Sequence, residues 1–226
     1  MTRPARADRT TVAVAGGKGG CGKTTTALGL ALALVRRGHR PVVADADVDV
    51  PDLHIRAGVD REPGLPALAA GHRPARVLQA SSTCPGVDVL AAGGARSETD
   101  AALRRLDDLH RPVLIDCPAG AGPDAATPLR AAGCTVVVTT SDTQSREDAA
   151  KTARMATALD APPTVTVRRA REPGRSGANG SAAGSPGTRQ QIAESREVSV
   201  PEVSGPPLRD DRTRERYERV VAALGW

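Results

Sequence analysis

The 226-residue sequence contains no phenylalanine, and Tyr217 and Trp226 are its only aromatic residues of the Phe/Trp/Tyr type. A hydrophobic core must therefore be built mainly from valine, leucine and alanine. No stretch reaches the roughly 18 uninterrupted apolar residues that a membrane-spanning helix requires. Residues 1–9 are polar and lack the apolar segment of a secretory signal. We therefore expect a cytoplasmic protein.

Lysine is almost absent as well, since arginine carries nearly all of the basic charge. The only lysines are Lys18, Lys23 and Lys151, and two of them fall within one short glycine-rich segment, which makes that segment informative. The four cysteines are widely spaced and form no CxxC pair, so neither a disulfide framework nor a tetrahedral zinc site is expected. The net charge of +5 permits contact with nucleic acid or an anionic membrane, but a solvated basic surface is the favoured explanation.

Short runs rich in β-branched residues alternate with segments of helical periodicity. Strands are predicted at residues 11–15, 41–44, 87–91, 113–115, 135–140, 164–168 and 198–203, and helices at 23–37, 98–109, 122–132, 145–159 and 210–224. This alternation predicts an α/β fold, doubly wound, in which helices cover both faces of a mainly parallel sheet.

We expect residues 1–226 to form one domain, with a core at 10–170 and a C-terminal strand and helix at 197–226. Residues 171–190 are rich in Gly, Ser, Ala and Pro, so they are expected to form a flexible surface insertion. The last predicted helix carries an apolar stripe at i, i+3, i+4 and i+7: Tyr217, Val220, Val221 and Leu224. Because acidic and basic residues alternate around that stripe, packing on the core is favoured over membrane insertion.

Residues 17–24 have the sequence GKGGCGKT, which satisfies GxxxxGK[ST] directly after a predicted strand and before a predicted helix. Glycines let the backbone curl so that successive N–H groups point at phosphate oxygens, and the helix N-terminus adds positive potential. In this pattern Lys23 reaches the β- and γ-phosphates and the Thr24 hydroxyl ligates Mg²⁺. The expected nucleotide contacts are Gly17, Lys18, Gly19, Gly20, Cys21, Gly22, Lys23, Thr24 and Thr25.

The segment KGGCGKTT, with its additional lysine at position 18, resembles the deviant Walker A loop of the MinD/ParA family of P-loop ATPases. The run of motifs is most similar to that of archaeal MinD-like proteins. The resemblance implies that Lys23 acts on the nucleotide of its own chain and that Lys18 reaches the partner's nucleotide across a dimer interface. It also implies ATP and Mg²⁺ as cofactors, ATP hydrolysis and an ATP-dependent homodimer.

Residues 42–47 (VVADAD) are similar to the family's strand that ends in Asp-x-Asp. The resemblance implies that Asp45 supports the Mg²⁺ shell and that Asp47 orients the attacking water. Carboxylates at i and i+2 of a strand point the same way, so both could face the metal and the γ-phosphate. A solvated acidic turn is the alternative, because Asp49 and Asp52 continue the run of charge.

Residues 113–120 (VLIDCPAG) fit an apolar strand that ends in a Walker B carboxylate. By resemblance, Asp116 belongs to the Mg²⁺ site and Gly120 senses the γ-phosphate through its backbone N–H. Residues 200–202 (VPE) are similar to the family's adenine-side segment, which adds Pro201. The strand expected to carry an adenine-side Asn instead has the sequence TVRR at 166–169, and the family's SVRD is replaced by SRED at 145–148. ATP over GTP is therefore supported chiefly by the resemblance.

Three functions are compatible with these motifs. The first is a spatial-organisation ATPase that acts in division-site placement, chromosome or plasmid partitioning, or protein positioning, with an unidentified activator or cargo protein. The second is an assembly ATPase for metal or iron–sulfur clusters, although only Cys84 and Cys117 could converge across a dimer axis. The third is a nucleotide-binding regulatory module with negligible turnover. Non-specific DNA is a further candidate target, through the arginines at 168, 169, 171 and 175, and a membrane is less favoured.

Overall fold

The computed structural model describes residues 10–171, 195–203 and 206–226. At its centre lies an eight-stranded sheet in the order β3-β4-β2-β5-β1-β6-β7-β8. Only β3 (Gln79–Ala80) pairs antiparallel with its neighbour, and the remaining pairs are parallel. The other strands are β1 (Thr11–Gly16), β2 (Val42–Asp45), β4 (Asp88–Leu90), β5 (Val113–Ala119), β6 (Cys134–Thr140), β7 (Pro163–Arg171) and β8 (Arg196–Glu202). The predicted α/β fold with a mainly parallel sheet is confirmed.

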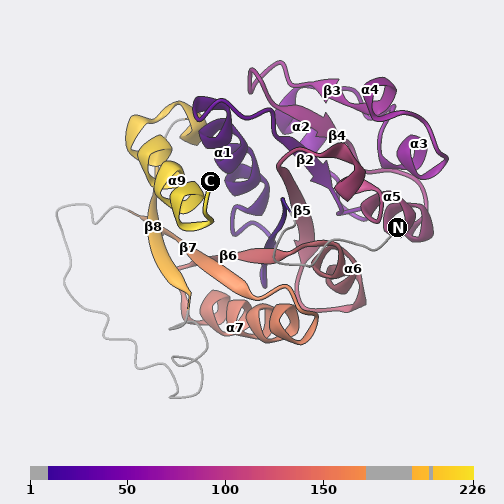
Figure 1. The fold of residues 1–226 in the computed structure, drawn as a ribbon. Helices are drawn as coiled ribbons and strands as arrows, with labels where there is room; N and C mark the ends of the chain where they lie inside the picture. The colour runs from indigo at the N-terminus through magenta and orange to yellow at the C-terminus, as the bar shows by residue number, and fades with distance from the viewer. Residues whose placement is uncertain (1–9, 172–194, 204–205) are drawn as a thin grey trace, which may run out of the picture.

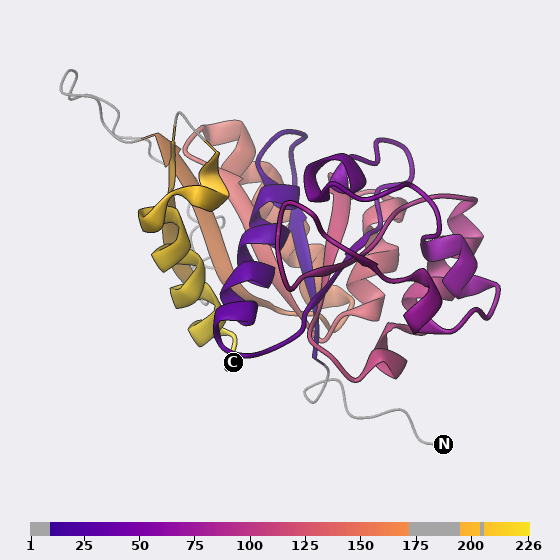
Figure 2. The ribbon, with the colours of Figure 1, turned by 90° about the horizontal axis from the view of Figure 1, so that it is seen from above.

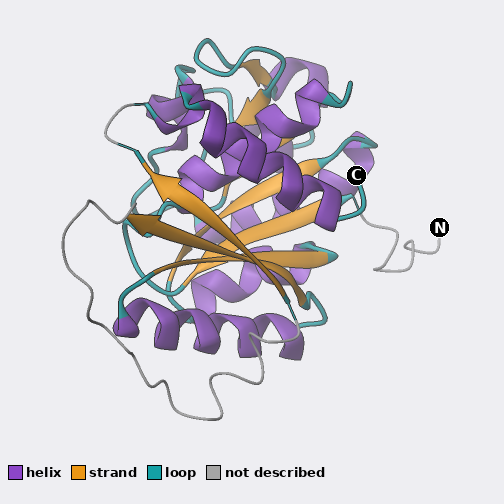
Figure 3. Cartoon of the chain, turned by 90° about the vertical axis from the view of Figure 1, so that its left-hand side faces the viewer, coloured by secondary structure: helices purple, strands orange, loops and turns teal. Residues whose placement is uncertain are grey.

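Helices cover both faces of this sheet (Figure 1, Figure 3). One layer contains α1 (Lys23–Arg36), α2 (Leu53–Ala57) and α9 (Asp211–Ala223). The other contains α3 (Leu65–Ala69), α5 (Arg96–Leu103), α6 (Pro123–Ala131) and α7 (Thr143–Ala158). The short α4 (Pro74–Val77) and the 3-10 turns η2 (Leu106–Leu109) and η3 (Pro207–Arg209) complete the connections.

The central strands are buried on both faces, which explains why they are continuous apolar runs rather than alternating ones. In β1, Val12 and Val14 pack into the core under α1 and α9, whereas Ala13 and Ala15 pack into the core on the opposite face. Alanine and glycine residues buried in α1 let the helix approach this face of the sheet closely. Because β1, β2 and β5 pair in parallel, their carboxyl ends lie side by side at one edge, where the glycine-rich loop leaves β1.

Helix α9 packs against α1, as both Figure 1 and Figure 2 show. Tyr217, Val220 and Val221 are buried in this contact, which confirms the predicted packing on the core. The Tyr217 ring lies against Gly29, where an added Cβ would come within 2.2 Å of Tyr217 Cε2. No helix of the described residues is long and apolar enough to cross a bilayer.

The structure differs from the sequence-based expectations in three segments. The helix predicted at 98–109 is divided into α5 and η2, because Leu103, Leu106 and Leu109 recur every three residues, the period of a 3-10 turn. The short helices α2, α3 and α4 were not predicted. Strand β7 ends at Arg171, so the expected insertion cannot begin there, and the rest of that segment, 172–190, lies outside the described residues.

Candidate functional site

The loop between β1 and α1 has the backbone geometry of an anion-binding turn. Gly20 and Gly22 have φ values of +77° and +96°, a left-handed region that glycine adopts without steric penalty. Gly22 is the N-cap of α1 and forms no side-chain cap. The first N–H groups of α1 therefore have no intrahelical acceptor and face the space in front of the helix. This arrangement suits a phosphate group.

A pocket of about 370 Å³ opens in front of this loop. Its volume lies within the range of about 300–1,000 Å³ that is usual for small-molecule sites. Among the residues predicted to bind the nucleotide, to bind Mg²⁺ or to act in catalysis, those that line it are Gly19, Gly20, Gly22, Lys23, Thr24, Thr25, Asp47 and Asp116. The motifs at the ends of β1, β2 and β5 are thus brought to one place.

Asp116 ends the apolar part of β5 inside this pocket and is 3% exposed. Burial raises the pKa of Asp116 to about 7, while the Thr24 hydroxyl and the Lys23 ammonium lower it and nearby Asp52 and Asp47 raise it. Its Oδ1 atom has no hydrogen-bond partner in the described part of the chain. A buried carboxylate oxygen without a partner is unfavourable unless it binds a cation or accepts a hydrogen bond from a cation-bound water.

Asp52 is a pocket residue that the sequence analysis placed only in an acidic turn. Its Oδ1 accepts a hydrogen bond of 3.0 Å from the Thr24 hydroxyl, and its Oδ2 accepts one of 2.7 Å from Arg56 Nε. Asp52 and Arg56 both line the pocket. The i, i+4 spacing of this pair is a local signal in the sequence, but its contact with Thr24 is not.

Asp45 does not line the pocket, although it ends β2. Its two oxygens accept hydrogen bonds from the backbone N–H groups of Asp47 and Leu53, at 3.0 and 3.4 Å. Burial, with a smaller contribution from Asp116, raises the pKa of Asp45 to about 8. Asp45 therefore holds both ends of the loop 46–53 through hydrogen bonds. Strand β2 ends at Asp45, so the strand alternation that was expected to point Asp45 and Asp47 the same way does not extend to Asp47.

The second lysine of the loop points away from the pocket. Lys18 Nζ lies 3.9 Å from Asp142 Oδ1, with about half of each side chain exposed, and Lys18 is not among the pocket-lining residues. Asp142 is the N-cap of α7 and accepts a hydrogen bond from Ser145 N. Gly17 lies against the same helix, because a Cβ there would be 2.2 Å from Asp148 Cβ. The loop thus rests on the start of α7.

Three further residues predicted at the site lie at its margin. Cys21 is buried in the core, and burial raises the pKa of its thiol. The N–H of Gly120 donates to the Gly16 carbonyl at 3.2 Å. Pro201 pairs with Ala170 between β8 and β7. None of the three lines the pocket.

Arg169, near the end of β7, also lines the pocket. A Cβ on Gly22 would lie 2.3 Å from Arg169 Nη1, so the guanidinium covers the loop where α1 begins. Its Nε is buried and has no hydrogen-bond partner within the described residues. Arg168 instead forms an ion pair of 2.7 Å with Glu197. These two arginines, considered earlier as contacts for DNA, therefore have different environments.

The cysteines do not form a cargo site within one chain. Cys84 and Cys117 are 0% and 1% exposed, and burial, with a smaller contribution from Asp116, raises the pKa of the Cys117 thiol. A thiol needs exposure and a low pKa to act as a ligand for a transferred metal. The suggested convergence of Cys84 and Cys117 across a dimer axis is therefore not supported.

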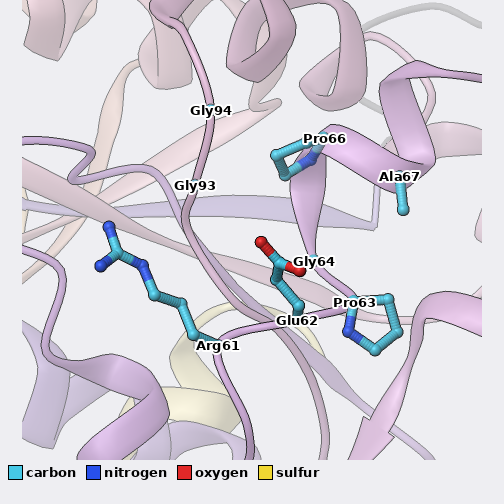
Figure 4. A pocket seen from close by; sticks show the side chains of 8 residues that line it. All are labelled: Arg61, Glu62, Pro63, Gly64, Pro66, Ala67, Gly93 and Gly94. Atoms are coloured by element: carbon cyan, nitrogen blue, oxygen red, sulfur yellow. The ribbon is translucent and has the colours of Figure 1, made fainter.

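A second pocket, of about 710 Å³, lies between residues 61–67 and the turn at Gly93 and Gly94 (Figure 4). It is lined by proline, glycine and alanine residues and by the side chains of Arg61 and Glu62. It shares no lining residue with the glycine-loop pocket. Size alone therefore does not identify the functional site, because the buried polar groups belong to the smaller pocket.

The fold and the pocket together define a P-loop nucleotide-binding domain. The model of the CobQ/CobB/MinD/ParA nucleotide binding domain matches residues 12–225. The chain therefore belongs to this family, and the resemblance to the MinD/ParA proteins is confirmed.

Individual proteins show the same similarity. An uncharacterized ATP-binding protein of Methanocaldococcus jannaschii is 33% identical over 150 residues, which cover 62% of this chain and 56% of that protein. The Pyrococcus furiosus cell division ATPase MinD superposes with a TM-score of 0.72 at 22% identity, over 95% of this chain and 98% of that one. MinD of Pyrococcus horikoshii, solved with Mg-ADP, gives a TM-score of 0.68 at 21% identity and 95% and 93% coverage. The chain spans about half the length of the curated relatives it matches.

Proposed function

We propose that the chain binds Mg·ATP in the glycine-loop pocket and hydrolyses it. The observation that carries this proposal is the convergence of Lys23, Thr24 and Asp116, whose Oδ1 has no partner within the described residues, in front of a helix N-terminus without a side-chain cap. Phosphoryl transfer requires little covalent chemistry from a protein, and depends on positioned phosphates, a divalent cation and an oriented water. The relative solved with Mg-ADP supports the same ligand.

The residues have distinct proposed roles. Backbone N–H groups of the loop and of Thr25 hold the phosphates, and Lys23 neutralises the β- and γ-phosphate charge. Thr24 and Asp116 hold Mg²⁺, which screens the phosphate charge when bound. Within the described residues no group of three or more His, Cys, Asp or Glu side chains could hold a metal alone. This fits Mg²⁺, which usually takes only one or two carboxylates and completes its shell with phosphate oxygens and water. Asp47, at the pocket wall, orients the attacking water.

Dimerisation on ATP is the second part of the proposal. Lys18 belongs to the loop but does not line its own pocket, and its ammonium forms a half-exposed ion pair with Asp142. Water screens such an exposed pair, so a partner's phosphate could compete for the lysine. The domain would then act as a MinD- or ParA-like ATPase whose dimer positions a cargo, with hydrolysis reopening it.

Single-turnover hydrolysis and light scattering test the function together. We expect ATP, but not ADP, to convert the wild-type chain to a dimer, and Asp47→Ala to remain dimeric because it does not hydrolyse the nucleotide. Lys18→Ala should bind ATP but stay monomeric. A chain that binds ATP, never dimerises and releases no phosphate would instead be a nucleotide-binding regulatory module. If ATP does drive dimerisation, pull-down with the Asp47→Ala dimer should capture the activator or cargo protein.

A further inference from the structure

The metal side of the pocket contains one hydroxyl and two carboxylates that can compete for its proton. A threonine hydroxyl has a single proton to donate and two lone pairs to offer. The Thr24 hydroxyl donates to Asp52 Oδ1 at 3.0 Å. It also lies close enough to Asp116 to lower the pKa of that carboxyl. Only one of the two carboxylates can receive the proton at a time.

The direction of this hydrogen bond decides what is left for a cation. Because the Thr24 hydroxyl donates its proton to Asp52, Asp116 Oδ1 stays without a partner within the described residues. If the hydroxyl turned to Asp116, it would occupy an acceptor site of that carboxylate that a metal-bound water could otherwise use, whereas the lone pairs of Thr24 are available in either case. The buried, unpartnered Asp116 oxygen points to a ligand that is not part of the chain.

Asp45 cannot perform the same task in this conformation. Both of its oxygens are engaged by backbone N–H groups, and it does not line the pocket. Asp52, in contrast, is partly exposed and is fixed from its other side by Arg56 Nε at 2.7 Å. This ion pair directs Asp52 Oδ1 toward Thr24. The side chain of Asp52 does not cap α2, although the residue is the N-cap of that helix.

From this geometry we infer that Asp52 is a positioning residue for the Mg²⁺ site: it accepts the hydrogen bond of the Thr24 hydroxyl and thereby leaves Asp116 Oδ1 free for a metal-bound water. The inference rests on the proposed function, since it concerns the same pocket. It assigns the support of the Mg²⁺ site, which the resemblance gave to Asp45 at the end of β2, to Asp52 at the N-cap of α2. The role requires two acceptor oxygens, one for Arg56 Nε and one for the Thr24 hydroxyl.

The test is a Mg²⁺ titration of the affinity for fluorescently labelled ADP, using the full chain. Asp52→Ala should raise the Mg²⁺ concentration at half-maximal enhancement about tenfold or more, the usual effect of removing a partner of a metal ligand. Asp52→Asn has one acceptor oxygen, which Arg56 Nε takes, so its amide N–H faces Thr24 and it should be as weak as Asp52→Ala. ADP affinity in EDTA should be the same in all variants, because the change concerns the metal alone.

Asp49→Ala is the matched control, since Asp49 belongs to the same loop but pairs with Arg96 outside the pocket. It should leave the Mg²⁺ midpoint unchanged, and thermal melts should confirm that every variant is folded. An unchanged midpoint in Asp52→Ala, an Asp52→Asn variant with the wild-type midpoint, or an equal loss of affinity in EDTA would each overturn the inference while the proposed function stands. A wild-type chain that binds no ADP would overturn the proposed function and this inference with it.

Discussion

Helix α1 takes part in two regions that differ in almost every physical respect. At its N-terminus, the pocket gathers polar groups that are buried but incompletely satisfied, such as Asp116 and Arg169. Along its length, the contact with α9 is filled by apolar side chains, with the Tyr217 ring resting on Gly29. In the first region, burial of unpaired polar groups costs free energy that a bound ligand can offset by pairing with them. In the second, burial of apolar surface stabilises the fold. Binding and stability should therefore be separable by mutation.

The largest expected effect is on the side of stability. Deleting residues 212–226 should unfold or aggregate the domain, because it exposes the core beneath α9 and removes Tyr217, Val220 and Val221. Each of these side chains contributes about 1.5–3 kcal/mol when fully buried, against a typical net stability of about 5–15 kcal/mol. Thermal melts followed by circular dichroism measure the effect. A truncated chain with the wild-type melting temperature would show that α9 is a separable appendage, and ATP-dependent liposome binding of the intact chain would then favour a membrane anchor.

The second prediction concerns the pocket. Lys23→Ala should weaken ATP binding at least about a hundredfold, which corresponds to about 2.7 kcal/mol, because the phosphate charge loses its buried counter-charge. The melting temperature should not fall, since Lys23 has no role in the apolar core. Titration of labelled ATP gives the affinity, and Lys151→Ala, at an exposed lysine on α7, serves as the control. An unchanged affinity in Lys23→Ala would refute the assignment of the pocket.

The two regions also differ in how far the sequence alone predicts them. The glycine loop was found because its residues are consecutive and their chemistry is local. The packing of α9 followed from a stripe at helical spacing, which indicates a buried face but not the surface it contacts. That surface is set by Gly29, whose lack of a side chain makes room for Tyr217, and no pattern within either helix connects the two.

The residues missed at the site share this limitation. Asp52 is 28 residues from Thr24, and Arg169 reaches Gly22 from the other half of the sheet, so both depend on how the chain folds. Within the local sequence Asp52 looks like part of an acidic turn, and Arg169 looks like a departure from the expected Asn. Helices α2, α3 and α4 were missed for a different reason: at five, five and four residues, they are too short to establish a period.

A third prediction targets the helix contact with a smaller change. Gly29→Ala should destabilise the domain by about 1–3 kcal/mol, the usual effect of overpacking a core, less the gain of about 1 kcal/mol that alanine brings to a helix. The clash is with the Tyr217 ring, so adding Tyr217→Leu should give a double variant that loses less than the sum of the two single variants. Urea unfolding of all four proteins gives the coupling. Additive losses would mean that α1 and α9 do not meet at Gly29.

The smallest expected effect is at the polar edge of the same contact, where Arg36 Nε lies 2.6 Å from Glu218 Oε1. The two side chains are 35% and 43% exposed, so water and salt screen the pair, and Arg36→Ala should lower the unfolding free energy by about 0.2–1 kcal/mol. Most of this loss should disappear at high salt, since the screening length falls to about 3 Å at 1 M. Urea unfolding at low and high salt measures it, and Glu218→Ala should behave alike. A loss well above 1 kcal/mol that persists at high salt would mean that polar contacts, and not the apolar stripe, hold α9 to α1. The contact between α1 and α9 would then not be an apolar stabilising region that contrasts with the polar binding region.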